Sequence, residues 1–243
     1  MPTQSNRPIP TPAPQSKAGG IAPAKRDALP SALLLAATGG LLDASVYTLH
    51  GHVFANAMTG NAILLGISVF GQDWMQALRH FVPICAFLIG VGCSRLLRVL
   101  PQFYASITVL VFEMTVLAIA GLLQPSFPEM AFTAIIAFVS AFQVSTFRMV
   151  GRFTYNSTFI TGNLRDFAES FIGRFVETGP DERRRNAAKA TKLFIICTSF
   201  VAGAVLGAWG APHLGNRTLW LTEPMLLIVL ARVAYLHEDS AIP

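Results

Sequence analysis

The chain has 243 residues, of which 53% are apolar and 13% are charged, and its formal net charge is +5. Because so few charged side chains cannot cover a water-soluble globule of this size, the composition excludes an ordinary soluble domain and favours a membrane protein. Lys and Arg are confined to the N-terminal tail and the predicted loops, which is typical of membrane topology signals and speaks against a nucleic-acid partner.

Residues 1–28 are rich in Pro, Ala, Ser and Thr and cannot bury a core, so we expect a disordered tail. A basic flank before an apolar run also resembles a signal peptide. Here the run continues to Leu49 without a small-x-small cleavage site. We therefore expect an uncleaved first span with the tail in the cytoplasm.

Six apolar runs are each close to the roughly 20 residues that cross a bilayer as a helix. They are Ala32–Leu49, Phe81–Leu97, Phe103–Leu123, Met130–Phe147, Leu193–Trp209 and Leu219–Leu236. Nothing alternates with a period of two, so barrel strands are excluded. The predicted fold is an all-α, polytopic bundle of transmembrane helices in contact with the lipid bilayer.

One tripeptide occurs twice, as Thr59-Gly60-Asn61 and as Thr161-Gly162-Asn163. An asparagine precedes each copy (Asn56 and Asn156), apolar helices flank each copy, and the last helix of each set carries a glutamate (Glu113 and Glu223). This pattern predicts two repeated membrane units, residues 29–123 and 129–236, separated by a proline-rich turn.

Each unit would hold three long spans and one short Thr-Gly-Asn helix, which gives six spans, or eight if the short helices cross. Six spans place the N-terminal tail, the strongly basic loop 174–192, the C-terminus and two arginine pairs in the cytoplasm, in agreement with the positive-inside rule. The pairs are Arg95 with Arg98 and Arg148 with Arg152. With three spans per unit the second unit is inverted, so the two short helices enter from opposite faces and meet near the midplane.

Asp43, Glu113 and Glu223 are carboxylates inside apolar segments. An ionised carboxylate at the bilayer centre costs at least about 2.5 kcal/mol, so each is a candidate for binding a proton or a cation. The structural alternative, a hydrogen bond between helices or a position nearer the interface, stays open for all three.

The Thr-Gly-Asn copies supply a flexible glycine beside donors and acceptors, which suits either a substrate-lining element or a helix cap. Gln143 stands in the second unit near the position that Asp43 has in the first. The predicted substrate or ion path consists of Asp43, Asn56, Thr59, Gly60, Asn61, Glu113, Gln143, Thr161, Gly162, Asn163 and Glu223.

His50 and His52 lie in one loop, but no third ligand has suitable spacing, so no metal or other cofactor is predicted. The three cysteines lie in apolar runs, which indicates no disulfide. Gly-x-Ser-x-Gly, His-Glu-x-x-His and phosphate-binding glycine loops do not occur, so the sequence does not support an enzyme.

Several short segments of the chain match the pattern of a known family. They are Gly40-Leu41-Leu42-Asp43-Ala44, Val53-Phe54 and Met58-Thr59-Gly60-Asn61 in the first half, and Gln143 and Thr158–Asn163 in the second. In these segments the chain resembles the YoaK-like family of multi-pass bacterial membrane proteins, domain of unknown function 1275. The resemblance covers about residues 30–236. It implies a bacterial inner-membrane location and supplies no mechanism. The family's usual Gly-x-Gln-Asn reads here as Ala141-Phe142-Gln143-Val144.

We therefore expect a transporter or channel for a small solute or ion in the inner membrane. The alternative is a membrane scaffold or sensor that acts through its basic cytoplasmic loop. A homo-oligomer is left open.

Overall fold

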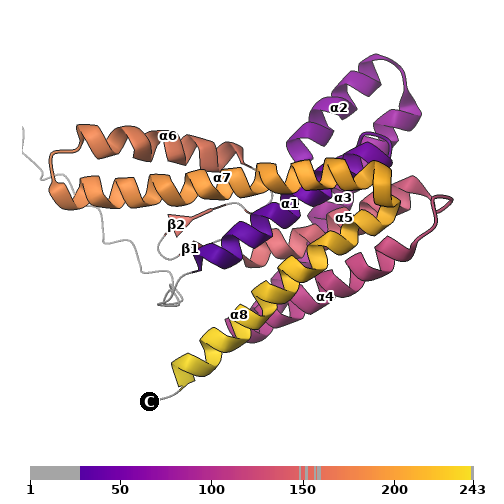
Figure 1. Ribbon diagram of the computed structural model, residues 1–243. Helices are drawn as coiled ribbons and strands as arrows, with labels where there is room; N and C mark the ends of the chain where they lie inside the picture. The colour runs from indigo at the N-terminus through magenta and orange to yellow at the C-terminus, as the bar shows by residue number, and fades with distance from the viewer. Residues whose placement is uncertain (1–27, 148, 151–152, 156, 158–159, 242–243) are drawn as a thin grey trace, which may run out of the picture.

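The computed structural model describes residues 28–147, 149–150, 153–155, 157 and 160–241, and these residues form eight α-helices (Figure 1). The helices are α1 (Leu29–Leu49), α2 (Met58–Phe70), α3 (Trp74–Ser94), α4 (Gln102–Leu122), α5 (Glu129–Thr146), α6 (Thr161–Val176), α7 (Pro180–Leu214) and α8 (Glu223–Ala241). Two 3₁₀ helices, η1 (Arg95–Val99) and η2 (Gly215–Thr222), precede α4 and α8. The strands β1 (Met149–Val150) and β2 (Phe153–Thr154) pair antiparallel between α5 and α6. The predicted helical class is confirmed.

The predicted disordered tail lies outside the described residues except for Ala28, as do Arg148, Arg152 and Asn156. The basic stretch 174–192, expected as a loop, is mostly helical, because α6 reaches Val176 and α7 begins at Pro180. Pro180 at the first helical position and Asp181 and Glu182 in the first turn are favourable at a helix start.

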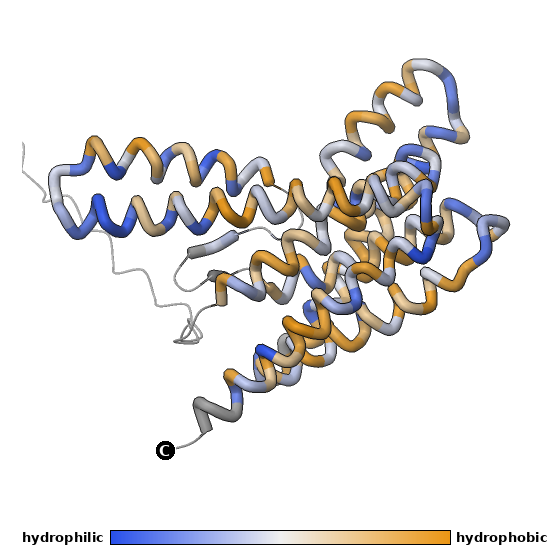
Figure 2. Tube along the Cα trace, in the orientation of Figure 1, coloured by the Kyte–Doolittle hydropathy of each residue, from blue (hydrophilic) through white to orange (hydrophobic). Residues whose placement is uncertain are grey.

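Five segments of the described chain are long and apolar enough to cross a bilayer: Leu29–Leu49, Trp74–Leu97, Gln102–Leu122, Glu129–Thr146 and Pro180–His237. The first four coincide with the first four predicted runs. The fifth has 58 residues, extends from α7 through η2 into α8, and covers the last two runs. Many large apolar side chains on these helices are exposed, among them Leu88, Val205 and Leu227, as expected for surfaces that face lipid. Figure 2 shows hydrophobic residues along these helices and hydrophilic ones in the first half of α7.

The helices pack in a regular pattern of pairs. α1 packs most extensively against α7, and α3 against α5, while the short helices α2 and α6 pack against α3 and α7. α4 packs against α5 and α8, and α8 also packs against α1. Glycines bring the main pairs close together, because a Cβ at Gly203 of α7 would overlap the backbone of Ala37, and one at Gly90 of α3 would overlap the carbonyl group of Phe138.

The main hydrophobic core lies between α1, α4, α5 and α8. Its fully buried side chains include Leu35, Leu42, Leu110, Leu117, Phe132, Ile136 and Leu226. Two helical hairpins extend from this centre. In Figure 1, α6 and the first half of α7 extend to the left, whereas α2 stands at the upper right. α7 has 35 residues and is about 52 Å long at 1.5 Å per residue, which exceeds the roughly 30 Å of a bilayer's hydrocarbon core.

Candidate functional site

The first Thr-Gly-Asn copy forms the start of α2 and holds the loop that leads into it. The Asn61 side chain donates through Nδ2 to the carbonyl oxygen of Phe54 at 2.8 Å and accepts through Oδ1 from the Phe54 N–H at 2.9 Å. Gly60 leaves room for the Phe54 ring, because a Cβ there would lie 2.8 Å from two ring carbons. Asn61 is fully buried, whereas Thr59 is exposed. The copy therefore fixes a backbone bend, and its threonine does not take part.

Asp43 of α1 holds the same loop at a second point. Its Oδ1 accepts hydrogen bonds from the backbone N–H groups of Asn56 at 2.6 Å and Ala57 at 3.3 Å. Asn56 in turn donates through Nδ2 to the carbonyl oxygen of Gly39 at 3.2 Å. The loop before α2 therefore returns along α1 to about the depth of Asp43, and these bonds favour the structural role that the sequence left open for this carboxylate.

The second copy forms the start of α6 with the same pattern of exposure. Asn163 is buried and Thr161 is exposed, as in the first copy, and Gly162 is intermediate. Tyr155, just before this helix, is buried in a cluster with Ala32 and Ala36 of α1. Burial raises the pKa of the Tyr155 hydroxyl group, so it is neutral at physiological pH.

The chain segments that lead into α2 and α6 therefore both contact α1. The cluster with Tyr155 includes Ala36, and the loop before α2 bonds to Gly39 and Asp43. Residues 36 and 43 are about two helical turns apart and lie on the same face of the helix. The structure thus brings the segments that precede the two copies to neighbouring stretches of one helix.

Gln143 joins the two units at another point. Its side chain is fully buried on α5, and its Nε2 donates to the carbonyl oxygen of Leu35 on α1 at 3.1 Å. Its Oε1 is buried without a hydrogen-bond partner in the described part of the chain. A buried amide oxygen without a partner is costly, so it is available to a ligand or to a water molecule.

Glu113 and Glu223 form the second group of predicted residues. Glu113 is fully buried on α4, and neither of its carboxyl oxygens has a hydrogen-bond partner among the described residues. Glu223, in the first turn of α8, has one buried carboxyl oxygen that also lacks a hydrogen-bond partner among the described residues. The two carboxyl groups lie within electrostatic range of each other. The sequence identified each glutamate separately but did not show that the two lie near each other.

The eleven predicted residues therefore do not line one continuous site. Asp43, Asn56 and Asn61 fix the backbone before α2, whereas Glu113 of α4 and Glu223 of α8 lie within electrostatic range of each other. Thr59 and Thr161 lie at the surface.

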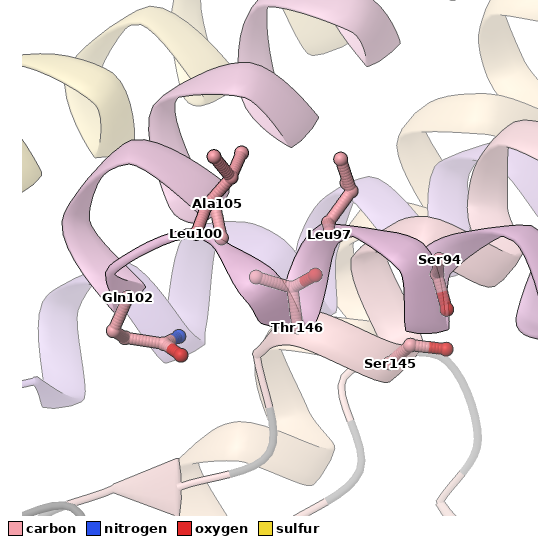
Figure 3. Close-up of a pocket in the computed structure, with 7 residues that line it drawn as sticks. All are labelled: Ser94, Leu97, Leu100, Gln102, Ala105, Ser145 and Thr146. Carbon is pink, nitrogen blue, oxygen red and sulfur yellow. The ribbon is translucent and has the colours of Figure 1, made fainter.

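A pocket of about 420 Å³ was not foreseen from the sequence (Figure 3). It lies where α3, η1, the start of α4 and the end of α5 meet. Its described lining residues are Ser94, Leu97, Leu100, Gln102, Ala105, Ser145 and Thr146. Isolated serines and threonines near helix ends are common in any membrane protein, so the sequence carried no signal for this grouping.

His50 lies at the C-terminal end of α1, where its side chain contacts the segments before α8 and the start of α5. Its Nε2 lies 2.9 Å from Oδ1 of Asn216, and its ring stacks on Phe132 with 3.9 Å between centroids. Burial lowers the pKa of His50, although its hydrogen bond to Oδ1 of Asn216 and the charge of Glu129 act in the opposite direction. Within the described residues, no three His, Cys, Asp or Glu side chains are grouped so as to hold a metal ion.

Comparison with known proteins places the sequence in a family. The sequence model for "Protein of unknown function (DUF1275)" matches residues 31–232. The chain is 25% identical over 204 residues to the "UPF0700 transmembrane protein YoaK" of Bacillus subtilis (strain 168), and the match covers 80% of this chain and 88% of that protein. No solved structure matches the chain.

Proposed function

This chain belongs to the DUF1275 family of multi-pass membrane proteins, and we propose that it is an ion-coupled carrier of a small solute in the bacterial inner membrane. Glu113 and Glu223 would bind the coupling proton or cation. The Thr-Gly-Asn helices would not line the path: α2 would be a re-entrant element packed on α3, and α6 would lie with the first half of α7 on the cytoplasmic side.

The observation that carries this proposal is the state of Glu113. Its carboxyl group lies within the core of α1, α4, α5 and α8 without a hydrogen-bond partner in the described chain, and Glu223 is nearby. A bare carboxylate in an apolar interior is strongly disfavoured, and two adjacent ones repel each other. A proton or cation bound between them removes both costs. Binding and release of that ion would therefore change the packing of α4 against α8.

The packing pattern supports an internal repeat. If α1–α4 are exchanged for α5–α8, the pair α1–α7 becomes α5–α3, and α2–α3 becomes α6–α7. In the same way α4–α5 becomes α8–α1, and α4–α8 maps onto itself. All these pairs are packed in the structure. A pseudo-two-fold axis would then pass between α4 and α8, beside the two glutamates, where carriers with repeated units commonly bind their ligands.

Charge and helix length support an inverted arrangement. α2 packs back on α3 and α6 packs back on α7, so each unit would contribute three full spans. The long helix α7 extends beyond a bilayer at its N-terminal end, where Arg183, Arg184 and Arg185 lie. The positive-inside rule then puts this end and both termini in the cytoplasm, and the turn between α2 and α3 outside.

The proposal is tested by the charge movement that accompanies ion binding. Proteoliposomes adsorbed on a solid-supported membrane would be exposed to a sodium concentration jump and, separately, to a pH jump. We expect one of these jumps to give a transient current in the native protein that is lost in Glu113→Gln. The matched control is Glu169→Gln on the exposed face of α6. No current in the native protein, or an equal current in Glu113→Gln, would contradict the proposal.

A second candidate function, a sensor or scaffold, has one observation in its favour. The α6–α7 hairpin extends from the bundle and is held by its own contacts, including a Lys189–Asp166 ion pair at 3.4 Å (Figure 1). Arg174 lies over the rings of Phe171 and Phe175, which gives α6 a mixed basic and aromatic surface suited to a membrane interface. Reversing the charge of Arg183, Arg184 and Arg185 would abolish signalling under this alternative, and Glu113→Gln would not.

A further inference from the structure

The pocket at Ser145 lies at one end of the helix bundle and is built from polar and apolar side chains. Figure 3 shows Ser94 and Ser145 at one end of the pocket and Gln102 at the other. The Ser145 hydroxyl group donates to the carbonyl oxygen of Ala141 at 2.7 Å, so its lone pairs remain available to a ligand. None of the described lining residues is charged.

A second group of residues occupies the corresponding place at the other end of the bundle. It consists of Ser45, Val46, Leu49, His50, Phe132, Asn216, Thr218 and Leu219. Ser45 stands near the end of α1 as Ser145 stands near the end of α5, and its hydroxyl group also donates to a carbonyl oxygen of its own helix, that of Leu42. η2 precedes α8 as η1 precedes α4. The exchange of units that relates the helix pairs therefore relates the ends of α5 and α1 and the 3₁₀ helices η1 and η2 at these two places.

The two places differ in openness. The Ser145 pocket has a volume of about 420 Å³, whereas the group around Ser45 leaves no room for a water-sized molecule. Ser45 is fully buried, and Ser145 is half-buried.

We propose that the Ser145 pocket is the inner vestibule for a small, neutral, hydrogen-bonding solute, and that the group around Ser45 is its closed outer counterpart. This inference rests on the proposed carrier function and names its substrate class and the state that the structure represents.

The lining sets the chemistry of the solute. Three hydroxyl groups and the Gln102 amide offer donors and acceptors, and Leu97, Leu100 and Ala105 offer apolar contact. Because a water molecule occupies about 30 Å³ of liquid, the pocket volume equals about 14 water molecules, which suits a solute with roughly ten to fifteen non-hydrogen atoms. A monosaccharide or a nucleobase has this size and polarity.

One face of α4 extends from this pocket to Glu113. Gln102 donates to the Ser106 hydroxyl group at 3.4 Å, and Val109 and Glu113 follow at intervals that keep all four residues on one face of α4. Val109 is fully buried and separates the polar pair from Glu113. A solute in the pocket would thus be one apolar side chain away from the ion site.

The closed end is held by a chain of contacts through Asn216. Its Nδ2 donates to the carbonyl oxygen of Leu123 at 2.9 Å, so its Oδ1 faces His50 and accepts from the His50 Nε2–H. Stacking of His50 on Phe132 joins α1 to α5 at the same level. Breaking this chain should open the Ser45 end.

The test compares two matched cysteine variants, Ser145→Cys and Ser45→Cys, in the full chain with Cys85, Cys93 and Cys197 replaced by alanine. An impermeant thiol reagent is applied to right-side-out and inside-out membrane vesicles. We expect Ser145→Cys to react from the cytoplasmic side and Ser45→Cys to react about tenfold more slowly or not at all, because a buried thiol reacts only after local opening. Asn216→Ala should then raise the reactivity of Ser45→Cys from outside and lower that of Ser145→Cys.

The solute class is tested by protection of Ser145→Cys. Glucose, xylose and adenine are the neutral probes, and glutamate and lysine are the charged controls. We expect at least one neutral probe to slow the reaction several-fold and the charged ones to have no effect. Protection by charged probes alone, protection by none, or an unchanged Ser145→Cys rate in Asn216→Ala would overturn the inference. The charge movement that Glu113 controls is measured separately, so its presence without protection would refute the vestibule and leave the ion site standing.

Discussion

The side-chain amide of Asn61 pairs with both backbone polar groups of Phe54, at 2.8 Å to the carbonyl oxygen and 2.9 Å from the N–H. This pairing satisfies a bend in the chain at a depth where water is scarce. The pairing explains why an asparagine stands at this position without requiring a ligand.

Replacing Asn61 by alanine should therefore destabilise the folded protein. Both backbone groups of Phe54 would lose their partner, at about 1–3 kcal/mol each, or about 2–6 kcal/mol together. The thermal transition of the purified protein in detergent measures the loss. Thr115→Ala is the matched control, because Thr115 is exposed and bonds only to its own helix. An unchanged transition in Asn61→Ala would refute the clamp.

Two substitutions of Asp43 distinguish a role in positioning the loop from a role in ion binding. Asparagine at this position keeps an oxygen that accepts from the backbone of Asn56 and Ala57, whereas alanine does not. We expect Asp43→Asn to keep its membrane abundance and the ion-induced current, and Asp43→Ala to lose about 2–4 kcal/mol of stability. Loss of the current in Asp43→Asn at normal abundance would instead place Asp43 in the ion path.

The α1–α7 contact depends on glycine at position 203. Because a Cβ there would overlap the backbone of Ala37, Gly203→Val should cost 1–3 kcal/mol or more, about the range for overpacking a helix contact. Gly92→Val on α3 is the control, since a Cβ there meets nothing within 4 Å. Equal yields of folded protein for the two variants would contradict this packing.

The stability that depends on buried, neutral His50 should be lost in acid, because burial disfavours the charged imidazolium form. Because the pKa of His50 in the folded state is below its ordinary value of 6.5, the unfolded chain binds the proton more readily in the interval between the two values. The stabilisation from neutral His50 is complete above 6.5 and is lost as the pH falls through that interval. Glu129 of α5, which pairs with Arg79 of α3, lies near His50 and opposes the shift.

Thermal unfolding of the native protein and of His50→Gln, compared at about pH 7.5 and about pH 5, checks this pH dependence. Glutamine keeps a donor toward Asn216 but does not titrate, so the variant should lose less stability on acidification. His213→Gln, at an exposed position, serves as the control. An identical pH dependence in native protein and His50→Gln would exclude His50 as the cause.

Sequence reasoning located the elements better than their contacts. Run length predicted α1, α3, α4 and α5, because a helix in lipid needs about 20 apolar residues. The Thr-Gly-Asn copies coincide with the starts of α2 and α6. The pairing of Asn61 with Phe54 was not predictable, since it depends on the path of the loop.

The glutamate pair and the Ser145 pocket show the same limit. The cost of a carboxylate in lipid identifies Glu113, but its proximity to Glu223 depends on how α4 and α8 pack against each other. The pocket depends on where three helix ends meet. The basic stretch 174–192 was read as a loop because charge indicates exposure and does not indicate backbone conformation.

The most direct test of the central claim, two units of opposite orientation around a carboxyl pair, is the side of the membrane on which the α2–α3 turn lies. Single cysteines at Gly71→Cys in this turn and Glu177→Cys in the α6–α7 turn would be introduced after replacement of the three native cysteines. An impermeant maleimide should label Gly71→Cys in intact cells and Glu177→Cys only after permeabilisation. Labelling of Gly71→Cys only after permeabilisation would mean that α2 crosses the membrane, and the inverted arrangement would be contradicted.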